Sequence, residues 1–389
     1  MKQTWKLYQK YANNLIFYGL FAELCHSKSV TIMKEKILNA LRQVDDPDLK
    51  KDVVTLGMIQ DLQVEGKKVS FRLVLTTPAC PLKDVIKNAC VTAIHHMVDQ
   101  SLEVNITLDA RVTSQQNNNK IQHGGIKNII AVASGKGGVG KSTVAVNLAI
   151  AMAQTGAKVG LLDADIYGPS LPTMLGLRGV KPTVEQNEDK LTIIPFEKYG
   201  IKAMSIGLLI DEKQALIWRG PMITSALKQL MNDVAWGDID YLFVDMPPGT
   251  GDIYLTLMQN FPVTGAVIVT TPQQVAIADT KKSIEMFRIQ AINVPILGIV
   301  ENMSYFTPAE LPGNKYFIFG KGGGEELAST YGLQILANLP LVGHVAEEAD
   351  RGIPAVLSSD SFLQTEFMQL TQKVAQHVST LNNKGPEQL

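Results

Sequence analysis

The sequence predicts an α/β protein with a doubly wound, mostly parallel sheet, preceded by a small α+β domain. Two observations support this prediction. The 389 residues exceed what one hydrophobic core usually serves, about 250–300 residues, so two domains are expected. In the second part of the chain, short apolar runs without polar alternation recur between helical stretches. Such runs are typical of parallel strands that helices cover on both faces.

The composition is that of a globular protein without a bulk charge. Hydrophobic residues make up 46% of the chain, and 36 Lys and Arg stand against 37 Asp and Glu. This excludes a largely disordered chain and gives no general attraction to nucleic acid or anionic membranes, so we expect neither as a partner. The cysteines, Cys25, Cys80 and Cys90, include no C-x-x-C pair, which favours a reducing compartment and a cytoplasmic location.

The small domain is predicted over residues 33–112 as helix, strand, helix, strand. Met33 opens a helical apolar stripe, and Lys68–Thr76 alternates as a half-buried strand does. A second helix is expected from Pro81, and Leu102–Val112 reads as a second strand. The remaining chain divides into an N-terminal extension (1–32), a polar linker (113–125), the second domain (126–380) and a tail (381–389).

Six apolar runs predict the strands of the second domain. They are Asn128–Ser134, Lys158–Ala164, Tyr241–Asp245, Gly265–Thr270, Ile296–Glu301 and Leu333–Leu339. A helix is expected over Ser142–Gln154, directly after the first strand. Another is expected near the end, from about Ser361 to Leu381, with a single lysine beside its apolar stripe. That pattern favours a helix packed on the domain over one that binds a membrane.

The turn between the first strand and its helix fits the phosphate-binding pattern G-x-x-x-x-G-K-[ST]. Its members are Gly135, Lys136, Gly137, Gly138, Val139, Gly140, Lys141, Ser142 and Thr143. Glycines let backbone N–H groups surround an anion, and the helix N-terminus adds its positive end. Lys141 should reach the β- and γ-phosphates, and Ser142 should offer its hydroxyl to Mg²⁺, so ATP and Mg²⁺ are the expected cofactors. Lys136 is a second lysine that an ordinary phosphate loop does not require.

Three aspartates stand at predicted strand ends. Asp163 and Asp165 close one strand, where the following loop would cross the γ-phosphate. Asp245 ends the apolar string YLFVD, which is the arrangement that holds Mg²⁺ in many nucleotide-hydrolysing proteins. Ligands of such sheets gather at the carboxyl ends of strands, so these side chains are expected at one site.

Four ordered strings carry a specific resemblance. KGGVGKST, DADIYGPSLP, FVDMPPGTGD and IVENMSYF together resemble the Mrp/ApbC family of iron–sulfur cluster carrier ATPases, which belong to the deviant Walker A, SIMIBI class of P-loop NTPases. The DDPDL and TTPACP strings of the small domain resemble the domain that precedes the ATPase in that family. The resemblance covers about residues 33–375.

The resemblance implies roles for individual residues. Lys136 would reach the phosphates across a homodimer that encloses ATP, and Asp165 would orient the attacking water. Asp245 and the following PPGTGD would couple the state of the γ-phosphate to the geometry of the dimer, and Asn302 would contact adenine. Implied partners are an iron–sulfur scaffold or apoprotein clients.

One departure from the family concerns the cluster. In many members a C-x-x-C follows the ENMSYF string, and two protomers together hold a bridging [4Fe–4S] cluster. The segment 305–324 of this chain contains no cysteine. Four thiolates normally hold such a cluster, so the usual site is missing. Cys80 lies where a helix N-terminus would lower the pKa of its thiol, which makes it either a reactive or cluster-binding thiol or a structural residue. Cys90 is expected in the core.

Three functions follow as hypotheses. The first is a dimeric, Mg-ATP-dependent ATPase that acts in iron–sulfur cluster assembly or transfer. The second is an ATP-gated scaffold that hydrolyses negligibly and recruits assembly partners. The third is a positioning ATPase of the MinD/ParA kind, although the neutral charge and the absence of a basic amphipathic tail argue against it.

Overall fold

The computed structural model describes residues 30–114, 125–187, 190–209, 220–308, 310–311 and 313–383. They form two compact units. Unit 1 runs to Thr76 and from Cys80 to Arg111, and unit 2 comprises Thr77–Ala79 and the chain from Val112 onward.

Unit 1 is a three-stranded sheet with helices. Its elements are a helix over 30–41, β1 (Asp45–Asp46), β2 (Lys51–Asp52), β3 (Ile59–Glu65), β4 (Lys68–Leu75), α2 (Lys83–Met97) and β5 (Glu103–Ala110). The sheet order is β3-β4-β5, with β3 antiparallel and β5 parallel to β4. The sequence prediction missed β3. In this edge strand only Val64 is buried, and polar residues interrupt the alternation that reveals a strand.

Unit 2 contains an eight-stranded sheet in the order β10-β11-β7-β12-β6-β13-β14-β15. Its strands are β6 (Ile126–Ser134), β7 (Val159–Asp163), β10 (Phe196–Lys198), β11 (Ile201–Ser205), β12 (Ile239–Asp245), β13 (Val263–Thr270), β14 (Ile296–Glu301) and β15 (Ile335–Asn338). Every pair is parallel except β10 with β11. A separate hairpin joins β8 (Val184–Asn187) to β9 (Lys190–Ile193). The six predicted strands are present, whereas β10 and β11, which are short and carry lysines, were missed.

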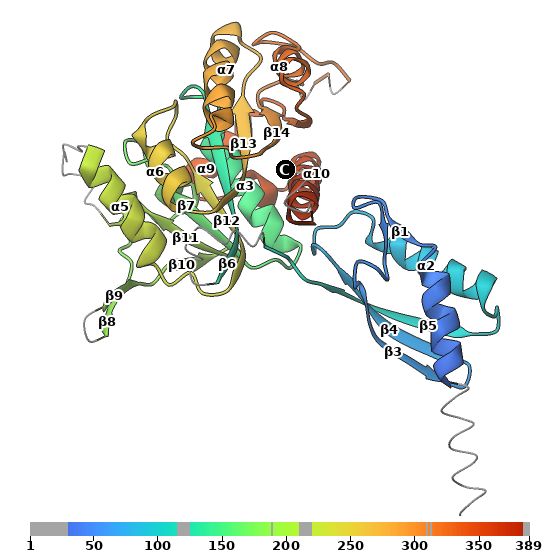
Figure 1. Cartoon of the computed structure of the whole chain (residues 1–389). Helices are drawn as coiled ribbons and strands as arrows, with labels where there is room; N and C mark the ends of the chain where they lie inside the picture. Colours follow the sequence, from blue (N-terminus) through green and yellow to red (C-terminus); the bar gives the residue numbers. More distant parts are fainter. Residues whose placement is uncertain are drawn as a thin grey trace, which may run out of the picture. The chain divides into compact units, whose positions relative to one another are not determined.

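Helices cover both faces of this sheet (Figure 1). They are α3 (Lys141–Gln154), α4 (Leu171–Met174), α5 (Gly220–Asn232), α6 (Asp252–Asn260), α7 (Gln274–Arg288), α8 (Gly323–Tyr331), α9 (Gly343–Asp350) and α10 (Ser361–Asn383), with short 3₁₀ turns at Ile206–Leu208 and Ala355–Leu357. On β6, Ile130 and Val132 face the core with α3 and α10, whereas Ile129 and Ala131 face the core with α5–α8. The doubly wound α/β fold is therefore confirmed.

The last helix packs on the sheet as the sequence predicts. Phe367, Leu370, Val374 and Val378 of α10 are buried, while Phe362 in its first turn is 48% exposed. Among the described helices, none has both the length and the apolar character that a membrane span requires.

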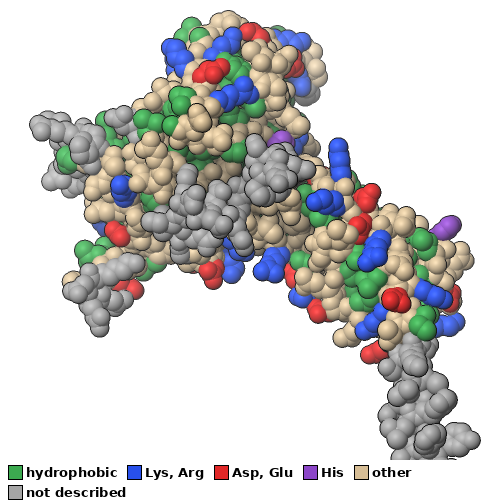
Figure 2. Space-filling model, viewed as in Figure 1, with side chains coloured by type: hydrophobic (Ala, Val, Ile, Leu, Met, Phe, Trp, Pro, Cys, Tyr) green, Lys and Arg blue, Asp and Glu red, His purple; other side chains and the backbone are tan. Residues whose placement is uncertain are grey.

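Charged side chains of opposite sign intermix on the surface of α7 and α8 (Figure 2). Lys281 lies 3.2 Å from Glu326, and Lys282 lies 3.0 Å from Asp279. Because these charges are paired, this surface presents no uniform basic field.

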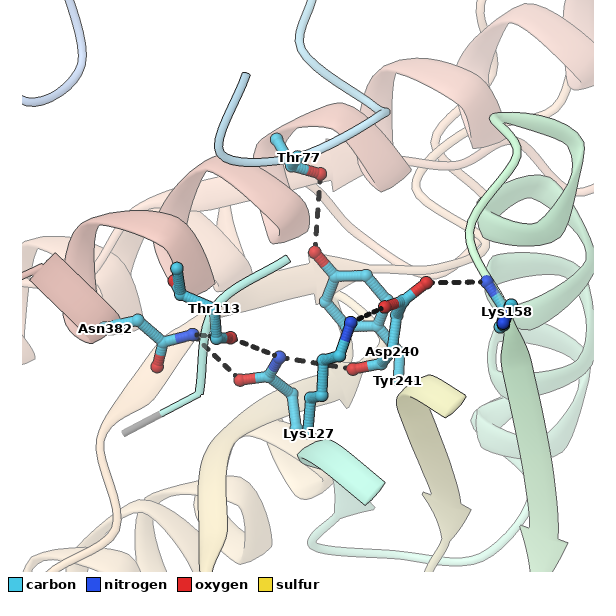
Figure 3. Close-up of polar contacts among 8 residues, drawn as sticks. Thr77, Thr113, Lys127, Lys158, Asp240, Tyr241 and Asn382 are labelled. Carbon is cyan, nitrogen blue, oxygen red and sulfur yellow. Dashed lines mark hydrogen bonds and ion pairs between the residues drawn. The ribbon is translucent and has the colours of Figure 1, made fainter. Parts of the chain in front are cut away.

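A polar network fixes the amino-terminal ends of the central strands (Figure 3). The buried Asn128 amide donates to the carbonyl oxygens of Thr113 and Asp240, at 3.0 and 3.2 Å. Asn382 of α10 donates to the same Thr113 oxygen at 2.7 Å, and Lys127 pairs with Asp240 at 2.7 Å. These bonds join β6, β12 and α10 at the end of the sheet away from the glycine loop. They also satisfy the buried Asn128 amide, as buried polar groups in folded proteins require.

Candidate functional site

The glycine loop joins the central strand β6 to α3 and leaves its backbone donors without side-chain caps. Gly138 and Gly140 have φ values of 82° and 79°, a region that L side chains rarely adopt. Gly140 is the N-cap of α3, and no side chain caps that helix. A Cβ on Gly135 would lie 2.3 Å from the backbone of Asp279, so this position also requires glycine. The loop and helix end together suit an anion.

Lys141 and Asp245 form a buried ion pair at the carboxyl end of the sheet. The Lys141 Nζ lies 2.5 Å from Asp245 Oδ1 and 3.3 Å from the Ser142 hydroxyl, and the two charged side chains are 6% and 2% exposed. Burial raises the pKa of Asp245, and the nearby Lys141 ammonium opposes that shift. Lys141, Ser142 and Asp245, which the sequence assigned to phosphate and Mg²⁺, therefore lie together at this end of the sheet.

Asp163 is fully buried and braces the loop that follows β7. Its carboxylate accepts hydrogen bonds from the Asp165 N–H at 3.0 Å, the Ser205 hydroxyl at 3.1 Å and the Leu171 N–H at 3.3 Å. Burial, followed by the Asp245 charge, raises the pKa of Asp163 to about 7. Sequence reasoning missed Ser205 because it lies on the unrecognised strand β11.

Two other predicted residues lie where the loops reach solvent. The half-buried Asp165 lines a cavity with Pro247 and Pro248, which follow Asp245. Lys136 is exposed at the outside of the glycine loop. The structure therefore leaves the Lys136 side chain accessible from outside its own loop.

Asn302 lies against the glycine loop from the end of β14. Its side-chain amide donates to the Val139 carbonyl oxygen at 2.9 Å, and the side chain is buried. The preceding Glu301, which sequence reasoning did not single out, accepts from the Ser304 hydroxyl at 2.9 Å and from the Gly324 N–H at 2.5 Å. A Cβ on Gly324 would lie 2.8 Å from the Glu301 carboxylate, so this position requires glycine. The glycines of the FGKGGG string were therefore the sequence feature that could have pointed to Glu301.

The segment after Asn302 contains an isolated β-bridge and no cysteine. The backbones of Phe306 and Tyr316 exchange two hydrogen bonds of 2.8 Å, and the Leu341 N–H donates to the Tyr305 carbonyl at 2.7 Å. Tyr316 and Ile318 are 46% and 58% exposed. Aromatic and aliphatic side chains thus occupy a segment that has no thiolate.

The prediction that a helix N-terminus lowers the pKa of Cys80 is wrong. The thiol is buried, and burial raises its pKa, with smaller contributions in the same direction from Asp48 and Asp46. The backbone N–H of Leu82 lowers the pKa of the thiol, but by less than burial raises it. Cys90 is fully buried in the core, as predicted, and burial raises its pKa to about 12.

In the part of the chain that the structure describes, no three or more His, Cys, Asp or Glu side chains are grouped so that they would hold a metal ion. Cys25 lies outside the described residues.

Each of the two units is similar to a known protein family. A family model described as "NUBPL iron-transfer P-loop NTPase" (ParA) matches residues 125–378, and one described as "iron-sulfur cluster assembly protein" matches residues 34–107. The chain is 48% identical over 349 residues to an iron-sulfur cluster carrier protein of Synechocystis, covering 89% of this chain and 98% of that protein. The carrier protein of Escherichia coli is 42% identical over 362 residues, covering 92% and 94%.

A solved structure, the nucleotide-binding protein of Archaeoglobus fulgidus in complex with ADP, is 40% identical with a TM-score of 0.52 and covers 61% of this chain and 91% of that one. The family match spans the whole sheet and the glycine loop of unit 2. The chain belongs to the ParA family of NUBPL iron-transfer P-loop NTPases.

Proposed function

We propose that the protein binds and hydrolyses ATP, as a homodimer around the nucleotide, in the assembly of iron–sulfur clusters or their transfer to apoproteins. The observation that carries the proposal is the buried Lys141–Asp245 pair beside an uncapped glycine loop. The names of its relatives support the iron–sulfur role, and unit 1 matches the assembly-domain model. The free Cys80 and Cys90 support a reducing compartment, the cytoplasm.

ATP binding uses the loop backbone and Lys141. The N–H groups at the start of α3 are not capped by a side chain, so they are available to phosphate oxygens. The Lys141 ammonium has three donors, of which Asp245 and Ser142 engage two. A phosphate oxygen would compete with Asp245 for this ammonium and so would link nucleotide binding to the loop that Asp245 begins.

The residues present fit Mg²⁺. Ser142 and Asp245 supply a hydroxyl and a carboxylate, the hard oxygen ligands that this ion prefers, and both contact the same Lys141 ammonium. When bound with ATP, the ion would neutralise phosphate charge. Asp163 holds the Asp165 backbone in place, so that the Asp165 carboxylate can position water at the γ-phosphate.

Lys136 would act on the nucleotide of a second copy. Its exposed side chain supports this role because it is accessible from outside its own loop. Such a group acting in trans stabilises the charge that develops on the transferred phosphoryl group. Dimerisation would then be required for hydrolysis but not for binding.

Four proteins test the nucleotide assignment: the wild type, Lys141→Ala, Lys136→Ala and Asp165→Ala. Titration calorimetry with Mg-ATP should show affinity reduced about a hundredfold in Lys141→Ala and preserved in Lys136→Ala. Single-turnover hydrolysis should fall about a hundredfold or more in Lys136→Ala and Asp165→Ala. Wild-type affinity in Lys141→Ala would place the nucleotide elsewhere. Equal hydrolysis by the wild type and Asp165→Ala would favour the ATP-gated scaffold.

Cluster carriage needs a separate test, because the segment after Asn302 has no cysteine and the described residues of one chain include no group of three or more potential metal ligands. Anaerobic iron–sulfide reconstitution of the wild type, Cys80→Ser and Cys90→Ser would be followed by iron content and the visible charge-transfer band. A cluster lost only in Cys80→Ser would assign the ligand to unit 1. No cluster in any of the three would make the protein an ATP-dependent switch of the pathway and not a carrier.

A further inference from the structure

A cavity of about 530 Å³ lies in unit 2 beside the glycine loop. Its walls come from the loops after β7 and β12 and from helices α5 and α6. The residues that matter here are Asp165, Tyr167, Ile223, Thr224, Pro248 and Ile253. The volume falls within the range of about 300–1,000 Å³ that binding pockets occupy.

Among the described residues that line this cavity, most are apolar and one, Asp165, carries a negative charge. Ile223, Pro248 and Ile253 form apolar walls, and Tyr167 is 70% exposed. The Thr224 hydroxyl already shares a hydrogen bond with Thr256 at 3.2 Å. Asp165 supplies the charged side chain, and none of the described lining residues is lysine or arginine. A second phosphate is therefore disfavoured, while an apolar group beside a cation is favoured.

The cavity shares its walls with the nucleotide site. A Cβ on Gly137 of the glycine loop would lie 3.9 Å from Pro248, and the Gly249 N–H donates to the Ser134 carbonyl, at the end of β6, at 3.0 Å. On the other wall, Asp163 holds the Asp165 backbone. A change in either loop with the state of the γ-phosphate would reshape the cavity, and by linkage a ligand there would change nucleotide affinity.

We propose that this cavity, in the ADP-bound protein, binds an apolar segment of a partner polypeptide in which a lysine or arginine next to the apolar residue faces Asp165, and that ATP, whose attacking water the Asp165 carboxylate positions, weakens this binding. The inference rests on the proposed function, since it names the surface by which an ATP-driven iron–sulfur protein would hold its client. A polypeptide fits because the cavity opens beside the exposed Tyr167 ring and provides both apolar and acidic contacts.

Fluorescence anisotropy on the full chain tests this with defined probes. The first probe is a fluorescein-labelled decapeptide of alternating leucine and lysine. Its controls alternate leucine with glutamate and serine with lysine. Each is titrated with protein saturated with Mg-ADP or with the non-hydrolysable β,γ-imido analogue of ATP. The leucine–lysine peptide should bind about tenfold more tightly than either control, and at least about fivefold more tightly with Mg-ADP than with the β,γ-imido analogue.

Two variants place the binding in the cavity. Tyr167→Ala removes an exposed ring that lines it, and Gly168→Phe adds a ring at a lining position where a Cβ would meet nothing within 4 Å. Both should weaken the leucine–lysine peptide about tenfold. Met222→Ala is the matched control, since Met222 is 48% exposed on the same helix as Ile223 but does not line the cavity.

Each contrary outcome has a definite meaning. Equal binding of the three peptides, independence of nucleotide, or an equal loss in Met222→Ala would overturn the inference while ATP binding by calorimetry leaves the proposed function standing. Absence of ATP binding would overturn both. Loss of nucleotide-dependent dimers in Gly168→Phe, seen by light scattering with peptide binding unchanged, would assign the cavity to a second copy and overturn the client site.

Discussion

Two loops in this protein each connect a strand to a helix without a side-chain cap, but the side chains beside them differ in their charged partners. The glycine loop connects β6 to α3, and the loop around Cys80 connects β4 to α2; in neither does a side chain cap the helix. In the first, positive-φ glycines leave the backbone open, and a buried lysine balances a buried carboxylate. In the second, the reactive group itself is buried, and its pKa rises. Burial raises the pKa of Asp245 as it does that of Cys80, but the Lys141 ammonium opposes the shift at Asp245, whereas the Leu82 N–H and a smaller contribution from Lys83 oppose it at Cys80.

The largest expected effect comes from breaking the ion pair of the first turn. In Lys141→Ala the buried Asp245 loses its partner, so without nucleotide the free energy of unfolding should fall by about 3–5 kcal/mol. Urea denaturation measures this loss. Lys136→Ala, in the same loop but exposed, should stay within about 0.5 kcal/mol of the wild type. Equal stability of the two variants would show that the pair contributes nothing to the fold.

Comparing two glycines separates backbone strain from collision. Gly138 and Gly140 both have positive φ, but a Cβ would meet nothing within 4 Å at Gly138 and would lie 2.2 Å from the Asn302 amide nitrogen at Gly140. Gly140→Ala should therefore weaken Mg-ATP about tenfold more than Gly138→Ala, because the collision disturbs the Asn302 bond to Val139. Titration calorimetry with Mg-ATP measures both affinities. An equal loss of affinity in the two variants would mean that the positive φ, and not the collision with Asn302, accounts for the loss.

The second turn predicts a slow thiol. In a Cys25→Ser background, Cys80 should react with iodoacetamide at neutral pH about tenfold more slowly in the folded protein than in urea. Its rate should rise with pH to a midpoint above the ordinary thiol pKa of 9.0, since burial disfavours the thiolate. Mass spectrometry resolves Cys80 from Cys90, which should be slower still because its pKa is about 12. If Cys80 reacts as fast in the folded protein as in urea, the hypothesis of an activated thiol at Cys80 would stand.

The smallest expected effect comes from removing the hydrogen bond between Ser205 and Asp163, next to the loop that follows β7. Ser205→Ala removes the hydroxyl that donates to Asp163, so the free energy of unfolding should fall by about 1 kcal/mol. A double-mutant cycle with Asp163→Ala, which removes the acceptor, isolates this bond. Additive losses in the cycle would mean that the two side chains do not act together.

The sequence alone predicted the doubly wound sheet, the glycine loop and the carboxylates at strand ends. These signals are local: apolar runs mark buried parallel strands, and the loop pattern depends on backbone freedom within nine residues. It also showed that the segment after Asn302 lacks cysteine. Helix α10 was equally predictable, since its apolar stripe repeats with the helical period.

Only the tertiary structure decided which groups are buried and with what partners. The edge strands β3 and β10 and the short inner strand β11 leave weak local signals because neighbouring elements, and not an apolar pattern of their own, bury them. Ser205 meets Asp163 across 42 residues, and Asn302 meets Val139 across 163. The pKa of Cys80 depends likewise on side chains packed around it from elsewhere in the chain. Ionisation follows the local dielectric and the nearest charges, and both are properties of packing that no stretch of sequence carries by itself.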